Sequence, residues 1–338
     1  MQDITVMGAG AFGLCIAWEA ARRGARVQVI DPWGPGAGAS GGVVGALAPH
    51  APESWTPAKA LQLQALELAP DWWAGVEAAS GLPTGYARTG RVQPLADDRA
   101  VSLARARAAG AATLWQDLAD WRVRPWQDSD PISPSGMVAE DTLTARLHPR
   151  LALAALVGAI RARGGIVAAD GPPQGPVIWA TGAAGLRDLS AALRRPVGCG
   201  EKGQALALRH AAPGAPQIYA PGLHIVPHAD GTVAIGSTSE RDYEDPATTD
   251  AQLDTLHARA VDVWPVLAQA PVVARWAGER PRAASRTLLL GEWPGRPGHF
   301  VANGGFKTGF AMAPVAAQMM ADLVLETRDR VPEAWRIG

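Results

Sequence analysis

Apolar and polar positions change their period several times along this chain of 338 residues. The short apolar run from Ile4 to Met7 predicts a β-strand, a helical pattern covers Leu14 to Arg23, and a second strand covers Arg26 to Ile30. Helical periodicity or composition also predicts helices at 57–79, 97–122, 151–163 and 313–327. Further strands are expected at 89–95, 166–169, 177–180, 203–209, 217–220, 223–228 and 232–238.

The order of these elements divides the chain into interleaved parts. Helices and strands alternate near the N-terminus and again around 150–195, as in an α/β fold with a parallel sheet. Around 80–140 and 200–280, strands are separated by Gly, Pro and Asp turns typical of an antiparallel sheet. We therefore expect two discontinuous domains, the first formed by 1–80, 141–200 and 295–338 and the second by 81–140 and 201–294.

The turn between the first strand and the first helix carries a glycine pattern that suits a dinucleotide. Gly8, Gly10 and Gly13 have the spacing Gly-x-Gly-x-x-Gly, and Asp31 ends the next strand. The first glycine allows a tight turn, the second lets the backbone approach a pyrophosphate, and the third packs helix against strand. The helix N-terminus then faces the phosphates, while the aspartate accepts hydrogen bonds from a ribose. A glycine turn without a ligand is the alternative.

The stretch between Pro32 and His50 is rich in Gly, Pro and Ala and carries no charge. An irregular segment of this length in a compact domain is usually functional or disordered. Its small residues suit a backbone that packs against a flat ligand, so we expect a ligand-contacting loop.

Composition narrows the class of protein. The formal net charge is −1 and no basic stripe is present, which argues against nucleic acid as a partner. No apolar run reaches the roughly 18 residues of a membrane span, and Met1 leads directly into a strand, so we expect neither a span nor a signal peptide, and a cytoplasmic protein. Cys15 and Cys199 are the only cysteines, which fits a reduced protein. No metal-ligand cluster or catalytic triad stands out, so we expect no metal.

Four segments stand in a fixed order: Gly8–Gly13 with Asp31, Ala39–Pro49, Ala180–Gly182, and Gly278–Pro281 followed by Asn303–Phe310. Together they resemble the D-amino-acid oxidase-like FAD-dependent oxidoreductase family, especially its glycine oxidase branch, with sarcosine oxidases as cousins. The resemblance implies an α/β fold, in which an FAD-binding Rossmann-like domain of the glutathione-reductase type is interleaved with a substrate domain on a mixed, largely antiparallel β-sheet.

The resemblance also implies non-covalent FAD, because sarcosine oxidases attach the cofactor through a cysteine in a region where this chain, after Cys199, has none. Free N–H groups at the N-terminus of the last helix would stabilise negative charge on the reduced flavin. The expected cofactor contacts are Gly8, Gly10, Ala11, Phe12, Gly13, Asp31, Pro32, Ala39, Ser40, Gly41, Gly45, Ala46, Leu47, Val167, Ala180, Thr181, Gly182, Gly304, Gly305, Phe306, Lys307, Thr308 and Gly309.

For substrate binding the resemblance points to Arg280, which stands where the family has a carboxylate-binding arginine. A guanidinium offers a planar fork of donors that matches a carboxylate. Its neighbours Arg275, Arg282 and Arg286 are expected to be solvated. Lys307 matches the lysine of the sarcosine oxidase turn, where a cation would favour the reduced flavin or assist reaction with oxygen. The glycine oxidase branch has a different residue there, so a role outside the active site stays open.

Two histidines complete the candidate catalytic residues. His50 follows the flavin-binding loop, and His224 opens the strand in which glycine oxidases carry an aromatic hydroxyl. Either imidazole could bind a polar or acidic substrate group, because it titrates near neutrality. A purely structural role is the alternative at both positions.

The reaction that the resemblance implies is oxidative deamination of an amino acid or N-substituted glycine. A hydride would pass from the α-carbon to flavin N5, the imino acid would hydrolyse to a 2-oxo acid, and oxygen, the expected acceptor, would become hydrogen peroxide. A dehydrogenase of the same fold with another acceptor, a flavoprotein acting on a modified tRNA base, and a NAD-binding regulatory protein are the alternatives. The substrate, its stereochemistry and a homo-oligomeric state stay open.

Overall fold

The computed structural model describes residues 2–337. Its strands are β1 (Asp3–Met7), β2 (Arg26–Ile30), β3 (Ala46–Leu47), β4 (Arg91–Pro94), β5 (Trp121–Pro125), β6 (Met137–Asp141), β7 (Ala145–Arg146), β8 (Ile166–Ala168), β9 (Val177–Trp179), β10 (Gly198–Arg209), β11 (Gln217–Ala220), β12 (Leu223–Pro227), β13 (Thr232–Gly236), β14 (Val272–Ala283), β15 (Leu289–Glu292) and β16 (His299–Asn303). Its α-helices are α1 (Ala11–Arg22), α2 (Pro57–Ser80), α3 (Asp98–Leu114), α4 (Pro149–Ala162), α5 (Gly182–Ala192), α6 (Ala251–Val263) and α7 (Gly309–Glu326).

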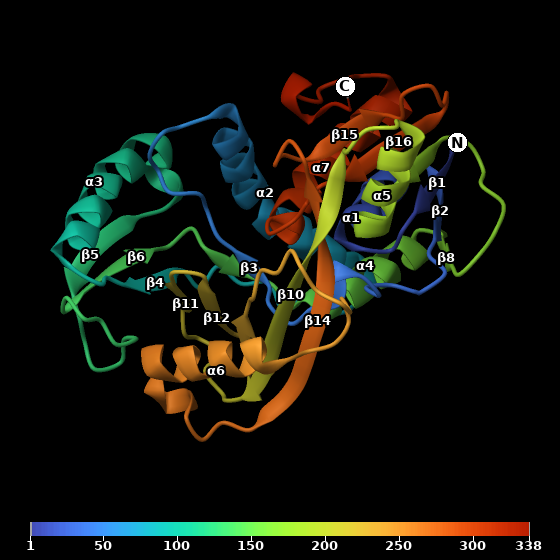
Figure 1. Cartoon of the computed structure of the whole chain (residues 1–338). Helices are drawn as coiled ribbons and strands as arrows, with labels where there is room; N and C mark the ends of the chain where they lie inside the picture. Colours follow the sequence, from blue (N-terminus) through green and yellow to red (C-terminus); the bar gives the residue numbers. More distant parts are fainter. Residues whose placement is uncertain (1, 338) are drawn as a thin grey trace.

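A six-stranded sheet with the order β15-β16-β9-β1-β2-β8 forms one layer of the molecule (Figure 1). Its strands run parallel except β15, which pairs antiparallel with β16. Parallel strands are usually covered on both faces, and the central residues of β1 are accordingly buried. The carboxyl ends of β1, β9 and β16 meet at one edge, which is where such sheets bind ligands.

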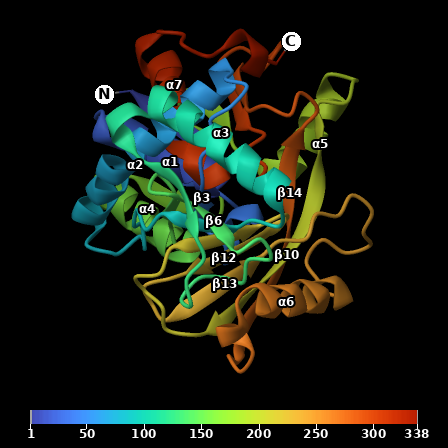
Figure 2. The ribbon, with the colours of Figure 1, turned by 90° about the vertical axis from the view of Figure 1, so that its left-hand side faces the viewer.

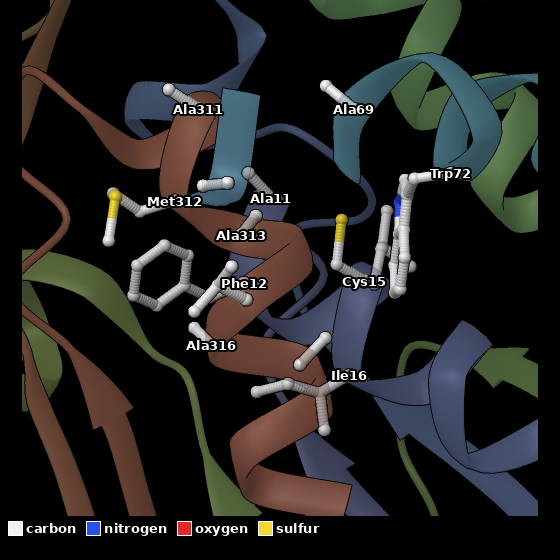
Figure 3. Close-up of a cluster of buried hydrophobic side chains, with 14 of the residues drawn as sticks. Ala11, Phe12, Cys15, Ile16, Ala69, Trp72, Ala311, Met312, Ala313 and Ala316 are labelled. Carbon is white, nitrogen blue, oxygen red and sulfur yellow. The ribbon is translucent and has the colours of Figure 1, made fainter. Parts of the chain in front are cut away.

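Helices α1 and α7 pack on each other against this sheet, and α2 lies beside them (Figure 3). All residues of α1 except the last are buried. Small side chains make the close approach of the two helices feasible: Ala11 of α1 and Ala313 and Ala316 of α7 lie in the contact, with Phe12 and Met312 filling its edge. The N-termini of α1 and α7 are thereby held in one core.

An eight-stranded sheet with the order β14-β10-β13-β12-β11-β4-β6-β5 forms the second layer. It is antiparallel except for the pair β4 and β11. Helix α6 covers one face, where Leu253 and Leu256 pack on Leu206 and Ile235 (Figure 2). The opposite face is lined by small residues such as Ala205, which pack with Val43 and Val44 of the loop that follows β2.

Strands β10 and β14 form a long antiparallel ribbon of 12 residues each, from the pair Gly198 and Ala283 to the pair Leu208 and Val272. One end of this ribbon contacts α6 through β10, and the other end packs against α5 of the first layer. The ribbon therefore belongs to the packing of both layers, as Figure 1 shows.

This architecture confirms the expected fold class, an α/β layer with a mixed, largely antiparallel second sheet. The helix expected over 97–122 is wrong at its end, because α3 stops at Leu114 and Trp121 begins β5, where it packs on Trp115. The last helix begins at Gly309 rather than at Ala313. The division into two discontinuous domains stays a prediction, and β15, expected in the second domain, pairs in the six-stranded sheet.

Candidate active site

The glycine turn after β1 is closed so tightly that side chains would not fit. Gly8 has a φ of +106°, and a Cβ there would stand 2.5 Å from the carbonyl oxygen of Ala180. A Cβ on Gly13 would stand 1.9 Å from the carbonyl oxygen of Gly8. Such contacts are sterically forbidden, so glycine is required at both positions. The turn is thereby held between α1 and the end of β9.

Polar groups around this turn match those that a dinucleotide needs. The Asp31 carboxylate accepts hydrogen bonds from the backbone N–H groups of Ala9 (2.8 Å) and Trp33 (3.0 Å), one on each oxygen. Each oxygen keeps a further lone pair for a ribose hydroxyl. The backbone N–H of Ala11 donates to the Ser40 hydroxyl (2.9 Å), and the first turn of α1 contains no acidic residue. The positive end of that helix is left for a phosphate.

The loop after Asp31 is ordered by close backbone contacts. A Cβ on Gly41 would stand 2.1 Å from the oxygen of Gly36, and a Cβ on Gly45 would stand 1.7 Å from the oxygen of Leu147. The loop includes a 3-10 turn at Ala39–Gly41 and the short strand β3, so it has more regular structure than expected from its composition.

The carbonyl oxygen of Val43, in the same loop, lies 3.0 Å from Nε2 of the buried His228. Burial, the largest effect, and the neighbouring His148 lower the pKa of His228 to about 4, although the Val43 contact acts in the opposite direction. His228 is therefore neutral at pH 7, and its Nε2 donates to Val43. His228 thereby fixes the loop from the opposite layer.

The second glycine-rich turn, between β16 and α7, lies beside the end of β9. The Asn303 amide donates to the oxygen of Gly182 (2.9 Å), which joins the two strand ends. Gly304 has a φ of +80°, and a Cβ on Gly305 would stand 3.1 Å from Cζ of Phe12. No side chain caps α7 and its first turn has no acidic residue, so its positive end also faces this edge.

The remaining expected cofactor contacts lie along the same edge or next to it. Thr181 precedes α5, and Thr308 donates from its hydroxyl to the oxygen of Gly305. Leu47 is fully buried in the core, and Val167 packs half-buried on the edge strand β8. The cofactor roles of Pro32, Ala39, Ala46, Leu47, Val167, Thr181 and Thr308 stay predictions, as do those of all the other expected contacts from Gly8 to Gly309.

Arg280 projects from β14 onto the face of the second sheet opposite α6. Its guanidinium donates to the Ser237 hydroxyl (2.7 Å) and to the carbonyl oxygens of Thr238 (2.7 Å) and Lys202 (3.2 Å). The residue is 9% exposed, and its buried Nε has no partner. Within residues 2–337 no carboxylate pairs with it at 4.0 Å or less. Burial lowers the pKa of Arg280, partly offset by the charges of Glu201 and Glu240.

Phe306 lies beside this guanidinium and is surrounded by cations. Cζ of Arg280 lies 5.5 Å from its ring centroid, Cζ of Arg282 lies 5.6 Å away, and Nζ of Lys307 lies 5.4 Å away. Arg282, expected to be solvated, instead pairs with the buried carboxylate of Glu201 at 3.1 Å. The expectation failed because only the β10–β14 register brings these residues together. Arg275 pairs with Asp254 of α6, on the other face of the sheet, and Arg286 is exposed.

Lys307 and His224 face the same space from different elements. Burial and the charge of Arg280 lower the pKa of Lys307, so these two cations lie close enough to repel. Burial, followed by the charges of Arg91 and Lys307, lowers the pKa of His224 to about 4. The buried Nδ1 of His224 has no partner, and its ring lies 4.9 Å from that of Tyr219. The structure thus brings Arg280, Lys307 and His224 together.

His50 does not join this group. Its ring is exposed, its backbone N–H donates to the Gln62 side chain (2.7 Å), and the cation that acts on it is Lys59 of α2. Within residues 2–337 no hydrogen bond, ion pair or ring contact links His50 to Arg280, Lys307 or His224. Its catalytic role stays a prediction.

Sequence reasoning missed several residues that line the site, namely Arg91, Glu201, Ser237, Tyr219 and Trp276. One signal was available for Glu201. Side chains alternate along a strand, so Glu201 shares one face of β10 with the small residues Gly203 and Ala205. A carboxylate beside two small residues indicates a face that another side chain or a ligand can approach. The others depend on pairing between strands far apart in sequence.

None of the helices within residues 2–337 has both the length and the apolar character needed to cross a membrane. The same residues hold no group of three or more His, Cys, Asp or Glu side chains placed to bind a metal ion.

Comparison with known proteins gives the family. The model of the family described as FAD dependent oxidoreductase matches residues 3–323. The glycine oxidase of Pseudomonas putida is 28% identical, over 96% of this chain and 94% of that protein. The bifunctional protein ThiO/ThiG of Trichormus variabilis is 27% identical over 97% of this chain, which spans only 53% of that relative. The chain thus spans about half the length of the bifunctional relatives.

The crystal structure of glycine oxidase from Geobacillus kaustophilus has the same fold, with a TM-score of 0.87 over 100% of this chain and 99% of that one, at 21% identity. Flavin fits the geometry above, since the glycines leave backbone free at two helix N-termini and Asp31 retains acceptor positions. The resemblance read from the sequence is therefore confirmed: this chain belongs to the FAD dependent oxidoreductase family, and its cofactor is FAD.

Proposed function

We propose that this chain oxidises a small amino acid, glycine or an N-substituted glycine, at its α-carbon. The observation that carries the proposal is Arg280, a buried guanidinium with no carboxylate partner in the described residues. A buried, unpaired charge is costly, and a ligand carboxylate removes that cost. The names of the relatives, glycine oxidase among them, agree with a small amino acid.

The side chains around Arg280 position a substrate more than they react with it. The guanidinium would donate to the α-carboxylate from Nε, which has no partner within residues 2–337. His224, uncharged near pH 7, adds no positive charge beside the substrate amine, and its free Nδ1 offers a hydrogen bond. When bound, FAD supplies the two-electron acceptor. The protein then contributes orientation and electrostatics, which suffice for amine oxidation without a dedicated acid or base.

Oxygen as the acceptor, with hydrogen peroxide as product, is part of the proposal. The test is a panel of glycine, sarcosine, D-alanine, L-alanine and L-proline added anaerobically to the FAD-loaded protein. We expect at least one of them to bleach the flavin absorbance, and admission of air to restore it with release of peroxide. If none bleaches the flavin, the proposed function is wrong. If bleaching is reversed only by an artificial acceptor, the protein is a dehydrogenase.

Arg280→Met and Arg286→Met form a matched pair for the carboxylate contact, since both remove one positive charge and Arg286 lies exposed outside the site. The Arg280 variant should weaken apparent substrate affinity by about 2–5 kcal/mol. The Arg286 variant should match the parent. Equal affinities in the two variants would remove Arg280 from this role.

A further inference from the structure

The cluster around the Phe306 ring contains more positive charge than the site itself neutralises. Arg280, Arg282 and Lys307 each lie within 5.6 Å of that ring centroid. Glu201 is the carboxylate that pairs with one of them, Arg282. Its second oxygen accepts from the Ser239 hydroxyl. Glu201 is thus the carboxylate in direct contact with this cluster, and it also pairs with Arg241 at 3.9 Å, whereas Glu240 acts on Arg280 only through its charge.

The two remaining cations differ from the other charged groups nearby. Arg91, which acts on His224, is committed to the Asp141 carboxylate at 2.8 Å. Arg280 donates only to neutral oxygens, and Lys307 has no hydrogen-bond or ion-pair partner among residues 2–337. The site thus offers two positive groups that are free to meet anions.

The backbone fixes these two cations relative to each other. The N–H of Phe306 donates to the oxygen of Pro281 (3.1 Å), the residue after Arg280. The N–H of Thr308 donates to the oxygen of Gly305 (2.8 Å), which closes the turn that carries Lys307. The turn that carries Lys307 is therefore tied to β14 next to Arg280.

We propose that the substrate of this site carries a second anionic group, a carboxylate, which Lys307 binds while Arg280 holds the α-carboxylate. The inference rests on the proposed function and narrows its substrate to amino dicarboxylates. Two anions on one ligand would neutralise both free cations and relieve their mutual repulsion. A substrate with one carboxylate would leave Lys307, an exposed residue, to water alone.

The competing role for Lys307 is to stabilise charge on the reduced cofactor. That role would affect every substrate alike, whereas a contact with a second carboxylate affects only ligands that have one. A ratio between two ligands that differ in this group alone separates the roles, because uniform effects cancel.

Methoxyacetate and oxydiacetate are suitable probes, since they carry one and two carboxylates on the same ether skeleton and have no amine to oxidise. Each is titrated into the FAD-loaded protein at pH 7.5, and the change in flavin absorbance gives its Kd. We expect oxydiacetate to bind at least tenfold more tightly than methoxyacetate. Lys307→Met should reduce this advantage to less than twofold, and the matched variant Arg286→Met should retain it.

The outcomes are distinct. Equal Kd values for the two probes, or an advantage that survives in Lys307→Met, would overturn the inference. If the variant lowers both affinities equally, Lys307 acts through general charge and the inference is likewise wrong. The proposed function fails separately, when no amino acid reduces the flavin. If glycine or sarcosine reduces it while the probes bind equally, only the substrate class is wrong.

Discussion

The guanidinium of Arg280 lies directly on the backbone of Gly203. A Cβ built at Gly203 would stand 2.6 Å from both Cζ and Nη2 of Arg280. The two residues belong to neighbouring strands, where Gly203 pairs with Gly278, two residues before the arginine on the same face. Because Gly203 has no side chain, the guanidinium of Arg280 can lie against the backbone of β10.

Gly203→Ala should displace the guanidinium and weaken binding of carboxylate ligands. The contact at 2.6 Å is too short for any Cβ, and the arginine, held by four oxygens, has to move. We expect KM for the best substrate to rise on the order of tenfold, about 1.4 kcal/mol. Steady-state kinetics with the flavin spectrum as a check of folding measures this. An unchanged KM would show that the guanidinium relaxes without loss.

Gly75→Ala is the matched control and a prediction of its own. Gly75 lies inside α2, is exposed, and nothing stands within 4 Å of a Cβ added there. Alanine should therefore raise the free energy of unfolding by about 0.5–1 kcal/mol, because it restricts the unfolded chain. Urea unfolding measures the gain, and the kinetics should match the parent.

Trp276 limits the space next to Arg280. A Cβ on Gly278 would stand 2.3 Å from the indole, and a Cβ on Gly42 of the loop would stand 3.5 Å from it. The indole thus fills the gap between β14 and the loop. Trp276→Ala should admit larger side chains, so that kcat/KM for a bulky amino acid rises about tenfold relative to glycine, by roughly 1.4 kcal/mol. Trp276→Phe serves as the control, and an unaltered preference in the alanine variant would contradict the prediction.

His228 should make stability depend on pH. Its pKa is about 4 in the folded protein against an ordinary value of 6.5. Between these values the unfolded chain binds more protons, so stability falls as pH falls from 6.5 to 4. The contribution lost is about 3 kcal/mol. His228→Gln, which keeps a donor for Val43, should flatten this part of the profile of unfolding free energy against pH. An identical slope in the variant would contradict the assignment.

Ser40→Ala should weaken cofactor binding. The Ser40 hydroxyl accepts from the first N–H of α1, beside the glycine turn. Loss of such a cap costs about 0.5–2 kcal/mol, which corresponds to a roughly twofold to thirtyfold rise in the Kd for FAD. Titration of the apoprotein by flavin fluorescence measures it. The exposed Ser102→Ala in α3 is a control.

The nucleotide turn could be predicted from sequence because its determinants are local. Gly8, Gly13 and Asp31 lie within one strand-helix-strand unit, and their spacing alone fixes the close contacts found in the structure. The strand expected at 217–220 is β11 with the same bounds, since turn residues flank it on both sides.

Long-range pairing could not be predicted in the same way. Arg282 looked solvated because Glu201 is distant in sequence, and only β-sheet register joins them. Trp121 followed a helical segment without any breaker, yet its indole donates to the oxygen of Ala104 (2.9 Å) from a strand, where packing on α3 outweighs propensity. His50 adjoins the flavin loop in sequence, but it is exposed, and within residues 2–337 no hydrogen bond, ion pair or ring contact joins it to Arg280.

The ribbon of β10 and β14 fixes where Arg280 lies relative to the six-stranded layer. At one end, Ala283 is buried in a cluster with Leu186 of α5 and Val301 of β16, so the ribbon is anchored in the nucleotide-binding layer. Arg280 lies three residues from that anchor, without a hinge between them. The position of the guanidinium relative to the nucleotide-binding layer is then fixed by the fold. Changes in substrate preference within such a scaffold would arise from exchange of the side chains around Arg280, such as Trp276 of β14 and His224 of β12, while the carboxylate stays in place.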